Sequence, residues 1–100
     1  MHIRELVNYL NTAIPPGLQE DYDNSGLLVG NTDNELSGVL ISVDVTEEVI
    51  EEANKKGANF ILSHHPLIFS GLKSLTGKNH VERSVMHAIK NDIALYEIGR

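Results

Sequence analysis

Two adjacent histidines are the residues of this sequence best suited to chemistry. His64 and His65 follow the apolar run 60–62 and precede Pro66. Neutral imidazole is the commonest protein ligand for transition metals. Adjacent side chains of an extended chain point in opposite directions, so the two rings would serve two ions, or one would bind while the other orients a neighbouring group. A polar strand end, with one hydrogen-bonded and one solvated histidine, is the alternative, and the spacing alone leaves both interpretations open.

Three further polar residues are candidates to line a site with these histidines. Asp44 follows another apolar run and could be a metal ligand, an acceptor for a histidine or a general base. It could equally be an extra cap for the helix that begins near Thr46. Asp23 and Asn24 could reach into the same cleft, although both residue types favour turns in any protein.

The elements that position these residues follow a strand–helix–strand pattern from residue 38 onward. Residues 38–44 are mostly apolar and β-branched, which predicts a strand covered on both faces. Residues 59–63 and 92–96 predict two more strands. The pattern indicates an α/β fold with a mostly parallel sheet, flanking helices and βαβ units. Ligand sites in such sheets lie at the carboxyl ends of strands, where Asp44 and the two histidines stand.

Three helices are predicted around this sheet. Apolar residues recur at helical spacing from Ile3 to Ile14. Thr46 can cap a second helix, which Gly57 is placed to terminate. Asn79 with Glu82 three residues later resembles a capping box that opens a third helix.

Charged residues on the second and third helices predict specific surface contacts. Glu51 with Lys55 and Glu52 with Lys56 stand at i,i+4 spacing, and both pairs are expected to form. His80 and His87 fall on the third helical pattern without a facing carboxylate. We therefore expect both histidines to be surface residues.

Composition excludes several classes of protein. The chain has 100 residues, 41% of them apolar, and a net charge of -6 from 8 basic and 14 acidic residues, without a basic cluster, so we expect no nucleic-acid partner. The absence of cysteine excludes disulfides and thiolate metal sites. The amino terminus lacks the features of a signal peptide, and no apolar run approaches membrane-spanning length. We expect one domain, residues 1–100, in an acidic cytoplasmic protein that has no membrane partner.

Three motifs in order carry a resemblance to a known family. They are residues 22–30 (Tyr-Asp-Asn-Ser-Gly-Leu-Leu-Val-Gly), 43–46 (Val-Asp-Val-Thr) and 62–69 (Leu-Ser-His-His-Pro-Leu-Ile-Phe). Together they resemble the dinuclear-metal-centre family known as GTP cyclohydrolase 1 type 2 homologues, over essentially the whole chain. The resemblance implies an α/β protein with two metal ions per subunit, assembled as a toroidal homohexamer.

The resemblance also implies roles for the candidate residues. His64 and His65 match the first two metal ligands of the family, one per metal, and Asp23, Asn24 and Asp44 match motif positions near the site. Zinc, iron and manganese all suit histidine and carboxylate ligands. The implied activity is that of a metal-dependent hydrolase that uses metal-activated water on a small-molecule substrate, whose identity the residues do not reveal.

The chain departs from the family pattern at two places. Tyr22 stands where members usually have Trp. After residues 93–96 members continue with a His-Thr-Asn-x-Asp segment carrying a bridging aspartate, and later with His-x-x-x-Glu ligands, whereas residues 97–100 read Glu-Ile-Gly-Arg. We therefore expect the amino-terminal part of a larger metal-binding α/β protein. Besides the hydrolase, a non-catalytic metal-binding or regulatory oligomer and an inactive truncated fragment stay open.

Overall fold

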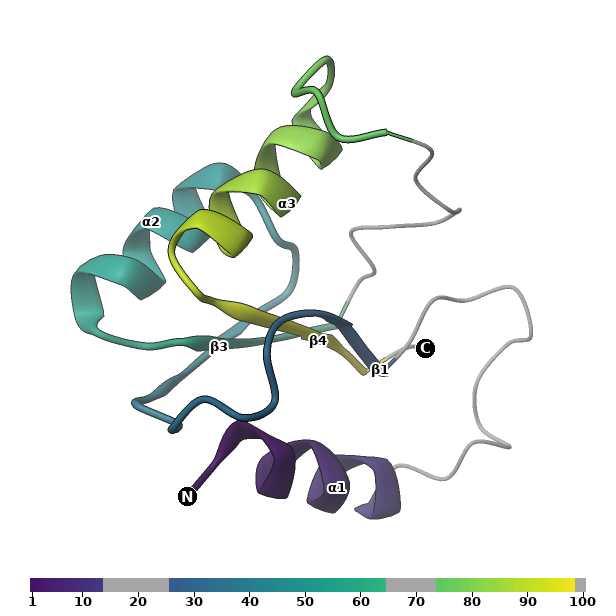
Figure 1. Ribbon diagram of the computed structural model, residues 1–100, viewed down its shortest axis with the longest axis vertical. Coiled ribbons are helices and arrows are strands. Elements are labelled where there is room, and N and C mark those ends of the chain that lie inside the picture. Colours follow the sequence, from purple (N-terminus) through teal and green to yellow (C-terminus); the bar gives the residue numbers. More distant parts are fainter. Residues whose placement is uncertain (14–25, 65–73, 99–100) are drawn as a thin grey trace.

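A computed structural model describes residues 1–13, 26–64 and 74–98 of the chain. Helices and strands alternate along most of these residues (Figure 1). The elements are, in order, α1 (Ile3–Ala13), β1 (Gly26–Val29), β2 (Val39–Ser42), α2 (Glu47–Lys56), β3 (Phe60–Ser63), α3 (His80–Lys90) and β4 (Ala94–Glu97). Within the described residues, no helix is both long enough and apolar enough to cross a membrane.

The four strands form one sheet in the order β1-β4-β3-β2. β2, β3 and β4 run parallel, and β1 pairs antiparallel with β4. Helix α2 connects β2 to β3, and α3 connects β3 to β4, as in two successive βαβ units. The predicted α/β class, with a mostly parallel sheet and βαβ units from residue 38, is confirmed. The short apolar run 27–29 alone did not predict β1, because three apolar residues between turns fit several structures.

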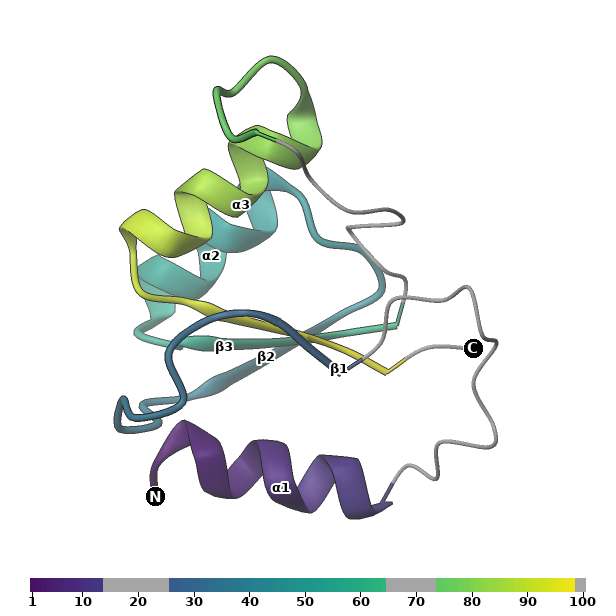
Figure 2. The ribbon, with the colours of Figure 1, turned by 45° about the vertical axis from the view of Figure 1, so that its right-hand side comes forward.

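Helices cover the sheet on both faces. Helices α2 and α3 lie on one face and α1 on the other (Figures 1 and 2). Side chains alternate between the faces, so that Phe60 joins the cluster under α1 while Ile61 joins the cluster under α2 and α3. On the α1 side, the ring of Phe60 stacks on that of Tyr96 with 6.0 Å between centroids. Tyr96 in turn donates to Asn11 Oδ1 of α1 at 2.6 Å, and burial raises its pKa.

The expectation that the strand in residues 38–44 is covered on both faces is wrong. Val39 is 43% exposed, Ile41 74% and Val43 59%. β2 is an outer strand of the described sheet, and the apolar face of α1 packs instead on Phe60 and Tyr96 of the inner strands. Only the opposite face of β2 is covered by helices, through Leu40, which packs against the cluster under α2 and α3.

Helices α2 and α3 begin and end as their sequences predict. The hydroxyl of Thr46 accepts from Val49 N at 3.2 Å, and Gly57 ends α2 with a φ of 76°, a conformation that favours glycine. The Asn79 side chain caps α3 by accepting from Glu82 N at 2.9 Å. The capping signals are local in sequence, which explains why they could be predicted.

The predicted pairing of Glu51 is wrong. Glu51 Oε1 lies 2.7 Å from His87 Nε2 of α3, and the described residues contain no ion pair between Glu51 and Lys55. His87 therefore has a facing carboxylate after all, supplied by the neighbouring helix, and its side chain is only 25% exposed. His80 is exposed, as predicted.

Candidate metal site at the carboxyl ends of the strands

The three parallel strands end side by side on polar residues. In the pairing register, Ser42 of β2 stands beside Ser63 of β3, and Ser63 stands beside Glu97 of β4. Each lies two residues after an apolar residue of the cluster under α2 and α3, so all three share that face. Gly26, where β1 starts, pairs with Glu97. We call this end of the sheet, residues 26, 42–44, 63–64 and 97, the carboxyl edge.

His64 and Asp44 both lie at the carboxyl edge, as predicted. His64 follows the last residue of β3, its side chain is exposed, and its backbone N–H donates to Ser42 O at 3.2 Å. Asp44 is exposed in the bend after β2, and its carbonyl accepts from Ser42 Oγ at 2.5 Å. These contacts fix the backbone on which the imidazole and the carboxylate are carried.

The other predicted site residues lie outside the described residues. They are His65, Asp23 and Asn24. The described residues nearest to them in sequence are both at the carboxyl edge, because His64 precedes His65 and Gly26 comes two positions after Asn24. That His65, Asp23 and Asn24 come together at one site therefore stays a prediction. Their nearest described neighbours, His64 and Gly26, lie at the same edge of the sheet.

Glu97 is a carboxyl-edge residue that the sequence analysis did not single out. It is 0% exposed, and its Oε2 accepts a hydrogen bond from Ser63 Oγ at 2.9 Å. Ile98 N donates to Ser63 O at 2.9 Å, so β4 is also held to β3 beyond its last residue. The sequence did contain a signal, because Glu97 directly follows the apolar run 93–96 of a predicted strand. Acidic side chains are rarely fully buried unless they are paired.

The donor chemistry of this edge fits a divalent transition metal. Imidazole and carboxylate groups are common ligands of zinc, iron and manganese. In the ranges 1–13, 26–64 and 74–98, no three His, Asp or Glu side chains are grouped closely enough to hold an ion. His65, the other histidine predicted for this site, lies outside these ranges.

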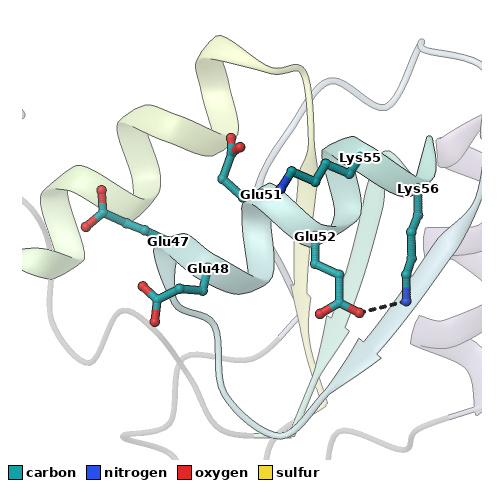
Figure 3. A pocket seen from close by; sticks show the side chains of 6 residues that line it. All are labelled: Glu47, Glu48, Glu51, Glu52, Lys55 and Lys56. Carbon is teal, nitrogen blue, oxygen red and sulfur yellow. Dashed lines mark hydrogen bonds and ion pairs between the residues drawn. The ribbon is translucent and has the colours of Figure 1, made fainter.

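A surface depression over α2 offers no comparable chemistry. It is lined by Glu47, Glu48, Glu51, Glu52, Lys55 and Lys56 (Figure 3). Lys56 Nζ lies 2.8 Å from Glu52 Oε2 on an exposed helix face, which confirms the predicted i,i+4 pair. Beside it, between α2 and α3, Arg83 Nε reaches Glu47 Oε2 at 3.3 Å. Together with the contact between His87 and Glu51, this ion pair joins the two helices and gives Glu47 and Glu51 a structural role.

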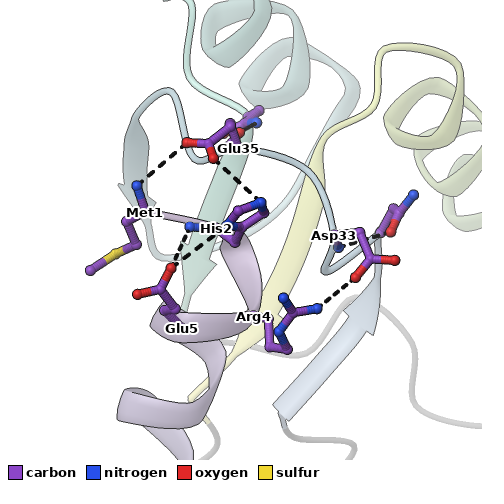
Figure 4. A network of polar contacts seen from close by, with 8 residues as sticks. Met1, His2, Arg4, Glu5, Asp33 and Glu35 are labelled. Atoms are coloured by element: carbon purple, nitrogen blue, oxygen red, sulfur yellow. Dashed lines mark hydrogen bonds and ion pairs between the residues drawn. The ribbon is translucent and has the colours of Figure 1, made fainter.

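Polar contacts at the opposite end of the sheet fasten the start of α1. The amino group of Met1 lies 3.4 Å from Glu35 Oε2, and His2 Nε2 lies 3.4 Å from Glu35 Oε1 (Figure 4). Arg4 Nη1 lies 2.6 Å from Asp33 Oδ1. The backbone N–H of His2 donates to Glu5, which lowers the pKa of the Glu5 carboxyl. These contacts join α1 to the segment before β2 and give His2 a structural role.

A family model matches nearly the whole sequence. The Duf34/NIF3 (NGG1p interacting factor 3) model matches residues 1–98. The chain therefore belongs to the Duf34/NIF3 family.

Relatives of known sequence and structure agree with this assignment. A Clostridium perfringens protein named GTP cyclohydrolase 1 type 2 homolog is 40% identical over 96 residues, which are 96% of this chain and 37% of that protein. The crystal structure of Staphylococcus aureus protein SA1388 is 42% identical with a TM-score of 0.92, covering 99% of this chain and 32% of that one. A Bacillus cereus protein related to NIF3 is 37% identical with a TM-score of 0.89, covering 99% of this chain and 27% of that one. The chain thus spans about a third of the length of these relatives.

Proposed function

We propose that the carboxyl edge is a dinuclear metal site, in which His64 and His65 are ligands and Asp23, Asn24 and Asp44 line the site. The observation that supports this proposal is that His64 and Asp44 both follow the carboxyl ends of adjacent parallel strands. Such ends are the usual place for ligands in open α/β sheets. Zinc, iron or manganese would each suit the donor set.

The activity that fits such a site is metal-dependent hydrolysis. A bound divalent cation supplies Lewis acidity and lowers the pKa of water. His64 would hold the cation at the end of β3, while Asp44 or Asp23 would orient water or a ligand. The relatives' name, GTP cyclohydrolase 1 type 2 homolog, suggests nucleotides as the first small molecules to try.

A second candidate is a non-catalytic metal-binding or regulatory protein that acts as an oligomer. The exposed apolar face of β2, Val39 and Ile41, is continued by Val43 and favours assembly, because adjoining exposed apolar side chains are a common feature of protein–protein interfaces. We propose a homo-oligomer, a hexamer in complete family members, with residues 1–100 as a single domain that forms the amino-terminal part of a longer, cytoplasmic protein.

Turnover by the metal-loaded chain distinguishes the two candidates. The chain would be stripped with a chelator, reloaded with Zn²⁺, Fe²⁺ or Mn²⁺, and incubated with GTP and other nucleoside triphosphates, with products separated by chromatography. The hydrolase proposal expects metal-dependent turnover that a His64→Ala/His65→Ala variant loses and a His80→Ala variant retains, since His80 is an exposed histidine on α3.

Two outcomes would contradict the hydrolase proposal. Turnover that is unchanged in the stripped protein or in the double variant would place the chemistry elsewhere. Full metal loading without turnover, together with a stable oligomer by light scattering, would favour the non-catalytic candidate. A change of Ile41→Lys on the exposed face of β2 would then be expected to dissociate the oligomer, with Lys56→Ala as the surface control.

A further inference from the structure

The outer side of β2, the side that faces away from β3, has the composition of a strand that can pair with another strand. In the described sheet, β2 stands last in the order and pairs with β3 alone. Residues 39–43 contain neither a charged residue nor proline, which are the usual means of preventing an outer strand from pairing. Val39 and Ile41 expose β-branched side chains on the α1 face of the sheet, and such side chains stabilise paired strands when they stand opposite one another.

The backbone of β2 directs hydrogen-bonding groups to this outer side. Ser42 O accepts from His64 N, so the peptide groups of Ser42 point toward β3. Because this direction alternates along a strand, the N–H and C=O groups of Val39 and Ile41 point away from β3. A second copy of β2, antiparallel to the first and related to it by a two-fold axis at the middle of the strand, would place the same groups opposite them.

The charges of α2 suit the same symmetry. Glu47 and Glu51 contact α3. Glu48, Glu52 and Lys56 lie along the side of α2 that faces away from α3 (Figure 3). When two copies of α2 run antiparallel, Glu48 of each copy stands near Lys56 of the other, and the two helix dipoles are opposed. The charges along this side of α2 are therefore complementary to those of an antiparallel second copy.

The spacing of the elements allows the two helices to come into contact. Helix α2 contacts both β2 and β3, so it lies above this pair of strands. Paired strands lie about 4.8 Å apart, which would put two copies of α2 about 10 Å apart across the axis. Packed helices are separated by about 8–10 Å. Pairing of the strands and packing of the helices are therefore compatible in one dimer.

We propose that β2 pairs antiparallel with β2 of a second copy of this chain, so that the two four-stranded sheets become one continuous sheet across a two-fold axis. This inference rests on the proposed homo-oligomer, to which it assigns a contact, and it is independent of the metal site. Val39 and Ile41 of each copy then stand beside those of the other, in a single apolar row between the two copies of α1.

Ile41→Lys tests the pairing of the strands. The dissociation constant of the dimer is measured by sedimentation equilibrium of the 100-residue chain. A lysine in the middle of the apolar row should raise this constant at least about a hundredfold. Met86→Lys is the matched control, because it places the same charge on an exposed apolar residue of α3, and its dissociation constant should be unchanged. Circular dichroism of each variant checks that it is folded.

A charge exchange tests the antiparallel order of the helices. Glu48→Lys places like charges opposite each other at two places in the dimer, and we expect a dissociation constant about tenfold higher. The double variant Glu48→Lys/Lys56→Glu restores opposite charges across the axis and should recover most of that loss. Lys56→Ala removes one exposed charge and leaves the dimer associated. Equal dissociation constants for the single and the double charge-reversal variant would overturn the antiparallel order.

Crosslinking separates this contact from other modes of assembly. The chain contains no cysteine, so Ile41→Cys carries a single thiol in each copy. A short bis-maleimide should join two copies of Ile41→Cys at least about tenfold faster than two copies of the control Met86→Cys, because only the first pair of thiols lies near the axis. If the chain is an oligomer that Ile41→Lys leaves intact and the two cysteine variants crosslink equally, the homo-oligomer stands and the β2 contact is overturned. If the unaltered chain is monomeric at millimolar concentration, the proposed homo-oligomer fails and this inference fails with it.

Discussion

The two ends of the parallel strands carry polar residues of different kinds. At the amino edge, where β2, β3 and β4 begin, Asn59 bonds only to backbone: its Oδ1 accepts from Ser37 N at 2.9 Å and its Nδ2 donates to Glu35 O at 2.7 Å. At the carboxyl edge the polar side chains include an exposed imidazole, an exposed carboxylate and a buried one.

We interpret this as a difference between residues that hold the fold and residues that are available to a binding site. An amide that joins neighbouring loops holds the fold, and its bonds are complete within the chain. At the other edge, the exposed His64 and Asp44 stand at the carboxyl ends of parallel strands, where open α/β sheets usually bind ligands. We therefore expect substitutions at the amino edge to lower stability without changing metal binding, and substitutions at the carboxyl edge to do the reverse.

The largest stability effect is expected for Gly30→Ala at the amino edge. Gly30 has a φ of 129°, and an added Cβ would lie 2.6 Å from Ala94 Cβ at the start of β4. Backbone strain and overpacking together should lower the free energy of unfolding by about 3 kcal/mol or more. Gly26→Ala, at the other end of β1, is the control: its φ is also positive, at 88°, but its Cβ would meet open space. Urea denaturation giving equal losses for both would contradict this account.

Asn59→Ala should have the next largest effect. Two backbone groups, Ser37 N and Glu35 O, lose their side-chain partners. We expect a loss of about 2 kcal/mol in the free energy of unfolding, with metal content per folded chain unchanged. A loss of metal with unchanged stability would remove the distinction between the edges.

The cap of α3 should contribute about 1 kcal/mol, the usual value for an N-cap. Asn79→Ala removes the bond to Glu82 N at 2.9 Å, and thermal unfolding measures the loss. Val81→Ala, one residue into the same helix, reports instead on packing against the core. If Asn79→Ala melted at the same temperature as the unaltered chain, the Asn79 cap would make no contribution to stability.

The pH dependence of stability should show the contribution of the ionised Glu82 carboxylate. The backbone N–H of Thr76, donating to this carboxylate, holds the pKa of Glu82 below its ordinary value of 4.5. A lowered pKa means that the contribution is complete above pH 4.5 and is lost as the pH falls through the folded-state pKa. Glu82→Gln should therefore flatten the acid side of a stability-against-pH curve. An unchanged acid limb would contradict the assignment.

The smallest effect is expected for Arg4→Ala. Arg4 Nη1 lies 2.6 Å from Asp33 Oδ1, but the two side chains are 53% and 77% exposed. Exposed ion pairs contribute between zero and about 1 kcal/mol, and salt screens them. Denaturation at low and high salt should show a small loss that salt removes. A loss above that of Asn59→Ala would mean that the amino edge depends on charge rather than on its amide.

The sequence predicted those features of the fold that depend on residues close together in the chain. The caps at Thr46 and Asn79 were found because each signal lies within four residues of its partner. The exposed face of β2 and the contact between Glu51 and His87 were missed, because both depend on where α1 and α3 pack. Helix spacing identifies an apolar face without identifying the strands that it covers.

Part of the candidate site was predicted from the sequence, and part was missed. His64 and Asp44 could be assigned to one edge because parallel strands place their carboxyl ends together. Glu97 escaped notice because its burial and its bond to Ser63 follow from the register of β3 and β4, which the sequence does not state.

Metal content is the most direct test of the carboxyl edge as a metal site. The purified 100-residue chain, His64→Ala/His65→Ala and the control His80→Ala would be loaded with Zn²⁺, freed of excess metal and measured by mass spectrometry. We predict near-stoichiometric metal in the unaltered chain and the control, and none in the double variant. Equal metal in all three, or negligible metal in all three, would contradict a site built on His64 and His65.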